Sequence, residues 1–301
     1  MRISKFLFAI FGLYLVSTSL NSATGQTNKA PEKLSLWTAK GKSNTVHFLG
    51  SIHYLKREFY PLPAPIEKAY TNAQIVVFET DMDRMKQPAI LEKIMAEGTY
   101  PAGKSIADEI SEEIYQLLRS TLSEKIGQPA ALDRFKPYLV AVTLGSLELQ
   151  RLGFQPEDGV DQYFMAKAKQ DKKKVLTLET IEEQMGFFTG MNKVEQEAFL
   201  KSSLTDMNQI EKMFGEIIAA WEKGDSQKLE GLIMDSMKEY PNLIKKFLTD
   251  RNKNWIPEFE KLLQGDKDAF VIVGAAHLVG SGSVIELLKA KGIKVEQQSA
   301  R

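Results

Sequence analysis

Short apolar runs alternate along this chain with longer segments of helical periodicity. Two of these runs, at 45–49 and 270–273, are rich in β-branched and aromatic residues, and in each case a glycine, two further residues and a histidine follow. Two other runs, at 75–78 and 175–178, have the same apolar character and are each followed directly by a glutamate. Short apolar runs of this composition predict buried strands.

The remaining pattern predicts a first strand at 34–40, a last strand at 293–296 and long helical regions between the strands. Helical spacing of apolar residues covers 105–153 and most of 194–263, and a shorter helix follows the Asp158-Gly159 turn. Helix starts are marked by capping boxes at Thr180 with Glu183 and at Ser283 with Glu286. Strands separated by helical segments predict an α/β fold with a mostly parallel central sheet and a large helical insertion. No change in composition divides the chain, so we expect a single domain over 34–298.

Four of the predicted strands end in residues that can carry chemistry: His53, Glu79, Glu179 and His277. If these strands are parallel, all four side chains lie at one edge of the sheet, where the sites of open α/β sheets are found. The chain has only three histidines, so two of them sharing the Gly-x-x-His context is a strong pointer to function. The third, His47, falls within a strand and is expected to serve packing.

Two imidazoles and one or two carboxylates are sufficient to bind a divalent metal such as zinc and leave positions open for water and substrate. Without a metal, one histidine and one glutamate can act as a base and the group that orients it. Glu179 also precedes a helix start, where a carboxylate is electrostatically favourable for structural reasons alone. Arg251 either lies on a helix surface or points into the site to bind a substrate carbonyl or carboxylate.

Composition narrows the classes of function. The chain contains no cysteine, which excludes disulfides, thiolate metal ligands and a cysteine nucleophile. Its formal net charge is zero, so we expect no nucleic acid partner. Residues 1–25 combine a basic start, an apolar run and small residues, and predict a cleavable signal peptide. The apolar run is shorter than the about 20 residues of a transmembrane helix. We therefore expect a periplasmic or secreted protein without stable membrane insertion after signal cleavage.

An ordered set of motifs resembles the TraB/GumN family and covers nearly the whole mature chain. The motifs are Leu49-Gly50-Ser51-Ile52-His53-Tyr54, Val77-Phe78-Glu79-Thr80-Asp81, Gly159-Val160-Asp161, Leu178-Glu179-Thr180-Ile181-Glu182-Glu183-Gln184, Asp250-Arg251-Asn252 and Val273-Gly274-Ala275-Ala276-His277. The family is similar to the TIKI proteins, metal-dependent proteases that trim the amino terminus of a secreted signalling protein. It more distantly resembles erythromycin esterases and ChaN-type haem-binding lipoproteins.

The resemblance implies that His53 and His277 bind a divalent metal such as manganese or cobalt, with Glu79 as ligand or base and with Glu179 and Arg251 in support. The sequence hypothesis is therefore an exported metal-dependent hydrolase that acts on a peptide or protein substrate. Two alternatives remain open at this stage. One is a binding protein whose helical region, rich in methionine and phenylalanine, holds haem or another apolar ligand. The other is a metal-free esterase that uses His53 with a glutamate.

Overall fold

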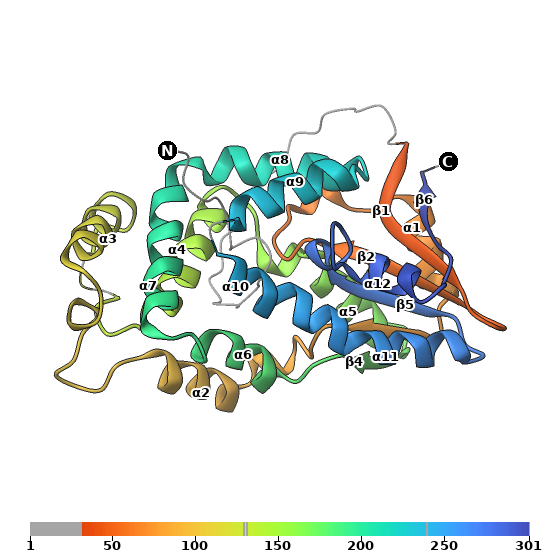
Figure 1. Cartoon of the computed structure of the whole chain (residues 1–301), viewed down its shortest axis with the longest axis horizontal. Coiled ribbons are helices and arrows are strands. Elements are labelled where there is room, and N and C mark those ends of the chain that lie inside the picture. Colours follow the sequence, from red (N-terminus) through yellow and green to blue (C-terminus); the bar gives the residue numbers. More distant parts are fainter. Residues whose placement is uncertain (1–31, 129, 131, 239, 301) are drawn as a thin grey trace.

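The structure is a computed structural model that describes residues 32–128, 130, 132–238 and 240–300 (Figure 1). The predicted signal peptide, residues 1–25, lies outside these described residues. None of the helices in the described part of the chain combines the length and the apolar character that crossing a bilayer requires.

A six-stranded sheet lies towards one end of the molecule (Figure 1). Its strand order is β4-β3-β5-β2-β1-β6. The four neighbours β4, β3, β5 and β2 are parallel, whereas β1 runs antiparallel to both β2 and β6. This confirms the predicted α/β fold with a mostly parallel sheet, although the last strand begins two residues later than expected. The strands are β1 (Lys33–Lys40), β2 (Thr45–Ser51), β3 (Ile75–Phe78), β4 (Lys174–Thr177), β5 (Ala269–Gly274) and β6 (Val295–Ser299).

Helices cover both faces of the sheet. Every residue of β5 is buried, as expected for a central parallel strand enclosed on both sides. Phe48 of β2 contacts Phe259 of α11, whereas Phe270 of β5 contacts Tyr70 of α1. Phe48 is aligned with Val271, and side chains of successive residues point to opposite faces. The helices α11 and α1 therefore pack on opposite faces.

The helical insertions lie beyond the sheet, and Figure 1 shows α2, α3, α4, α6 and α7 gathered on the side away from β1 and β6. Phe188 of α6 contacts the rings of Tyr138, Phe199 and Phe247, which gives this region an aromatic core of its own. The helices are α1 (Ala64–Asn72), α2 (Pro88–Gly98), α3 (Glu112–Lys125), α4 (Pro137–Arg151), α5 (Val160–Gln170), α6 (Ile181–Thr189), α7 (Lys193–Asp206), α8 (Ile210–Glu222), α9 (Ser226–Met237), α10 (Pro241–Ile244), α11 (Asp250–Gln264) and α12 (Val284–Ala290).

Candidate functional site

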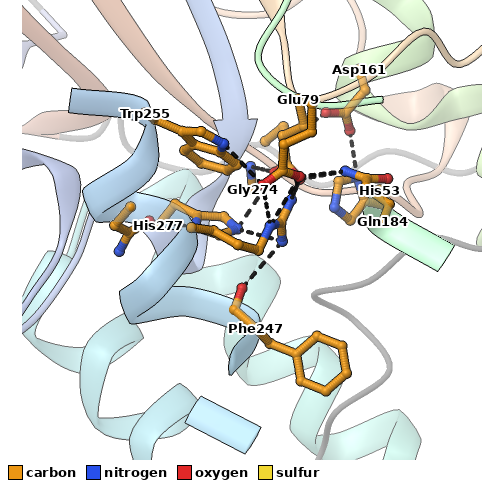
Figure 2. Close-up of polar contacts among 12 residues, drawn as sticks. His53, Glu79, Asp161, Gln184, Phe247, Trp255, Gly274 and His277 are labelled. Atoms are coloured by element: carbon orange, nitrogen blue, oxygen red, sulfur yellow. Dashed lines mark hydrogen bonds and ion pairs between the residues drawn. The ribbon is translucent and has the colours of Figure 1, made fainter. Parts of the chain in front are cut away.

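The four residues singled out at strand ends lie together at the carboxyl edge of the sheet, and Figure 2 shows three of them, His53, Glu79 and His277. Each follows one of the four parallel strands, so their order along the edge is Glu179, Glu79, His277 and His53. All four are buried, with exposed fractions between 0% for His277 and 9% for Glu179. Neighbouring parallel strands bring their ends to one edge, which is why His53 and His277, 224 positions apart, meet here.

Arg251 lies inside this cluster and holds both glutamates. Its Nη2 atom donates to Glu79 Oε2 at 2.5 Å and to Glu179 Oε2 at 2.8 Å, and its Nε atom donates to Glu179 Oε1 at 2.9 Å. The side chain is 1% exposed, so Arg251 does not lie on a helix surface. It occupies the first turn of α11, directly after a π-helical segment (Lys245–Thr249), and its Nη1 atom donates to the carbonyl of Phe247 in that segment. Such π turns are frequent at functional sites.

The two glutamates differ in proton affinity although they share one guanidinium. Burial alone would raise the pKa of Glu79, but the positive charge of Arg251 and the N–H of Gly274, which donates to Oε1 at 2.6 Å, help to lower that pKa to about 2. Burial raises the pKa of Glu179, Arg251 offsets part of this effect, and the nearby Glu79 carboxylate adds to it. Trp255 also donates from its indole N–H to Glu179 Oε1. Glu79 is therefore ionised near neutral pH, and Glu179 binds a proton more readily than Glu79 does.

His53 is held by a carboxylate. Its Nδ1 atom lies 2.7 Å from Asp161 Oδ2, and the hydroxyl of Ser51 donates to the other oxygen of Asp161. Asp161 is in the first turn of α5, which comes close to His53 because Gly159 precedes it. A Cβ atom at Gly159 would lie 2.2 Å from the carbonyl oxygen of His53. The Gly159-Val160-Asp161 motif thus orients the imidazole and leaves its Nε2 atom facing the site.

His277 is held by an amide, and the hydrogen bonds define its tautomer. The amide nitrogen of Asn252 donates to the carbonyl of Gly282, so the amide oxygen must face His277 Nδ1, at 2.6 Å. Nδ1 therefore carries the proton. Burial lowers the pKa of His277 to about 3, and the positive charge of Arg251 acts in the same direction. The ring is neutral at pH 7, with its Nε2 lone pair in the site, where Arg251 Nη1 donates to it at 3.2 Å.

The two imidazoles and Glu79 lie around Gly274 (Figure 2). A Cβ atom at Gly274 would lie 3.3 Å from Glu79 Oε1, 3.5 Å from His53 Nε2 and 3.6 Å from His277 Cδ2. This donor chemistry fits a divalent cation, because each histidine is also hydrogen-bonded at its other nitrogen, as metal-ligating histidines are. Nevertheless, no group of three or more His, Cys, Asp or Glu side chains in the described part of the chain is already arranged to hold a metal ion.

Asp161, Asn252 and Gln184 had no predicted role in the site. The side-chain amide of Gln184 on α6 donates weakly to both Glu79 and Glu179, at 3.3 and 3.4 Å. Each of the three stands in one of the ordered motifs quoted above, and that was the only signal that could have found them. His47, by contrast, lies in β2 as predicted and hydrogen-bonds to Thr38 of β1. Asp81 accepts the backbone N–H groups of Asp83 and Arg84 and so stabilises its own loop.

A pocket opens beside these residues, between the loop after β3 and helix α6. Its polar side is formed by His53, Glu79, Asp161, Gln184 and Arg251, and the rest of its wall is mostly apolar. The pocket has a cavity volume of about 30 Å³, which is room for about two water-sized groups.

The chain is similar to one protein family and to several known proteins. The model of the TraB/PrgY/gumN family matches residues 35–297. The chain is 26% identical over 244 residues to the uncharacterized protein YbaP of Escherichia coli strain K12, covering 81% of this chain and 87% of YbaP. It is also 21% identical over 322 residues to Metalloprotease TIKI1 of Danio rerio, covering 88% of this chain and 63% of TIKI1.

A Metalloprotease TIKI homolog of Nematostella vectensis is 21% identical over 318 residues, covering 87% of this chain and 66% of that protein. No solved structure matches the chain. The family match spans most of the sequence and contains every residue of the site described above. The chain belongs to the TraB/PrgY/gumN family.

Proposed function

We propose that this protein is a metal-dependent hydrolase that cleaves peptide bonds, with a divalent metal held by His53, His277 and Glu79. The observation that carries the proposal is the convergence of these three side chains on the space beside Gly274. Two further observations support it: each imidazole has its Nδ1 atom fixed by a buried partner, and metalloproteases are among the similar proteins. Manganese, cobalt and zinc all suit ligands of this type.

The charge of the cluster also supports a cation. Three carboxyl groups are buried in the cluster: Glu79 and Glu179, which share the guanidinium of Arg251, and Asp161, which bonds to His53. The His277 ring is neutral. Buried charge is costly unless it is compensated. A divalent metal bound here would supply Lewis acidity that polarises a substrate carbonyl and lowers the pKa of water.

The pKa directions support different roles for the two glutamates. Glu79, with a pKa of about 2, is too weak a base to accept protons efficiently near neutral pH, so it serves as a ligand. Glu179, whose pKa is raised, is the better candidate for proton transfer. Arg251 directs its N–H groups to the two carboxylates, Phe247 and His277. It therefore positions Glu79 and Glu179 rather than reaching a substrate directly.

One observation favours a second candidate, a metal-free hydrolase. His53 and Asp161 form a buried histidine–carboxylate pair at 2.7 Å, the arrangement that orients a catalytic base in many hydrolases. The haem-binding alternative gains less support, because the pocket beside the site has a volume of about 30 Å³, far below the several hundred Å³ of sites for large ligands.

Export belongs to the proposal as well. Residues 1–25 have the pattern of a cleavable signal peptide, and a zero formal charge gives no basis for a nucleic acid partner. We therefore propose that the enzyme meets its peptide or protein substrate outside the cytoplasm.

A peptide-library assay tests the proposed function. The mature chain is purified without nickel or chelators, loaded in turn with manganese, cobalt and zinc, and incubated with fluorescence-quenched peptides. We expect cleavage that EDTA abolishes, that added metal restores and that Glu79→Gln lowers by at least about 100-fold. Lys261→Met, on the exposed side of α11, is the matched control and should cleave like wild type. Cleavage that survives EDTA would favour the metal-free hydrolase, and no cleavage under any loading would contradict hydrolysis of peptides.

A further inference from the structure

The pocket beside the site has one apolar wall built from flexible side chains. Six residues form most of it, and five of them are buried; they come from the loop after β3 and from α6: Met82, Met85, Ile181, Met185, Phe187 and Phe188. Methionine has an unbranched, polarizable side chain that adjusts to the shape of an apolar occupant. Three methionines at one pocket thus make a wall that can widen around an apolar group without a change in the backbone.

Thr80 adds a polar feature to this pocket. It follows Glu79 directly, lines the same pocket and is 2% exposed. Its Oγ1 atom is buried and has no hydrogen-bond partner among the described residues. An unsatisfied buried hydroxyl costs stability, and most buried hydroxyls in proteins are paired. A hydroxyl left unpaired at a pocket wall, next to a site glutamate, therefore indicates a ligand group that completes its hydrogen bonding.

We propose that this pocket is a substrate subsite that takes an unbranched apolar side chain, such as that of methionine, from the residue next to the cleaved bond. The hydroxyl of Thr80 bonds to the peptide backbone of the same residue. This inference rests on the proposed function, because it identifies the side chain that the site selects. The apolar wall carries no charge, and the carboxylates on the polar side of the pocket, Glu79 and Asp161, are already bonded to Arg251 and His53. Lysine and glutamate side chains would therefore lose their hydration in the pocket with little compensation.

The shape of the pocket sets the size of the occupant. With room for about two water-sized groups, it accepts the end of a narrow side chain as it stands. A β-branched or indole side chain requires larger displacement of Ile181 and Phe188, which are buried residues at the two ends of α6. The preference expected is therefore methionine or norleucine first, leucine next, and valine or tryptophan last.

Binding tests the subsite without any need for cleavage. The protein is labelled with ¹³C at its methionine methyl groups and titrated with the acetylated amides of methionine, norleucine, valine, lysine and glutamate. We expect saturable shifts of the Met82, Met85 and Met185 signals, with the methionine compound binding at least about tenfold more tightly than the lysine compound. Met207 and Met213, which lie outside the pocket, serve as controls whose signals stay in place.

The Thr80→Val variant tests the hydroxyl, because valine keeps the shape and removes the donor and acceptor. We expect about fivefold to tenfold weaker binding of the methionine compound. Thr71→Val, at an exposed threonine of α1 whose hydroxyl donates to the carbonyl of Glu67 in the same helix, should bind like wild type. Equal binding by Thr80→Val would overturn the role of the hydroxyl. Equal shifts with the lysine compound, or none with any compound, would overturn the subsite.

The peptide assay separates the subsite from the proposed reaction. A set of peptides that differ at one position should be cleaved most rapidly with methionine or norleucine at the residue next to the cut. Cleavage with no apolar preference would refute the subsite and leave the hydrolase intact. Selective binding of the methionine compound without cleavage of any peptide would support the subsite and contradict the hydrolase.

Discussion

Replacement of Arg251 by methionine tests whether the guanidinium holds the site together. Arg251 is 1% exposed and donates to Glu79 at 2.5 Å and to Glu179 at 2.8 Å. Methionine fills similar volume but leaves two buried carboxylates without a counter-charge. Removing one partner of a buried ion pair typically costs about 3–5 kcal/mol. For a domain of this size each kcal/mol lowers Tm by about 2–4 °C, so we expect Arg251→Met to melt roughly 6–20 °C below wild type.

The assay is urea and thermal unfolding in EDTA, followed by circular dichroism. Lys261→Met is the matched control, since Lys261 lies on the same helix and pairs with Glu258 at the surface, where an ion pair contributes about 0–1 kcal/mol. Adding Glu179→Gln to Arg251→Met removes one of the unpaired carboxylates and should recover part of the lost stability. If Arg251→Met were as stable as Lys261→Met, or if the double variant were less stable than the single one, the reasoning would be refuted.

Three further predictions concern His277, Gly159 and Asn252. Because the pKa of His277 is about 3 in the folded chain against 6.5 for an ordinary histidine, the unfolded chain of metal-free protein binds the proton more readily. Stability should therefore fall as pH decreases below about 6.5, by roughly 3 kcal/mol at pH 4; a urea series that shows no slope beyond that of His277→Gln would contradict this. Gly159→Ala forces a Cβ against the His53 carbonyl and should cost about 1–3 kcal/mol in urea unfolding, whereas Gly215→Ala, with open space around it, should be neutral or stabilising. Asn252→Leu leaves the buried Nδ1–H of His277 without its partner and should lower the free energy of unfolding by about 1–3 kcal/mol. It should also lower the metal affinity measured by calorimetry by about 10–100-fold. Unchanged affinity would contradict the role of Asn252 in positioning His277.

The strands were predictable because their signal is local. A run such as Phe270-Val271-Ile272-Val273 is apolar at every position, which is what a strand buried on both faces requires. Parallel neighbours then bring their carboxyl ends to one edge, so the meeting of His53, Glu79, Glu179 and His277 followed from the fold class alone. The position of Arg251 was left open between two alternatives, because one arginine in a helical segment carries no record of the direction it faces.

The partners of the two histidines could not be predicted from local pattern. Asp161 lies 108 positions from His53, and Asn252 lies 25 positions from His277, and each contact depends on how a helix packs against a strand end. The close approach at Gly159 shows why: the contact exists because a residue without a side chain lets α5 reach the His53 backbone. Periodicity reports which face of a helix is buried, but it does not report which polar group lies opposite.

The most direct test of the shared metal site is the metal content of the mature chain, measured by mass spectrometry beside His53→Ala, His277→Ala and Gly274→Ala. Gly274→Ala is informative because its backbone suits alanine, with φ −50° and ψ 136°. Its new methyl group would nevertheless occupy the space between Glu79 and the two imidazoles. After loading with manganese, cobalt or zinc, the account predicts about one metal ion per wild-type chain. It also predicts loss of that metal in all three variants, with Gly274→Ala still folded. Wild-type protein that binds none of the three metals, or histidine variants that bind as wild type does, would contradict it.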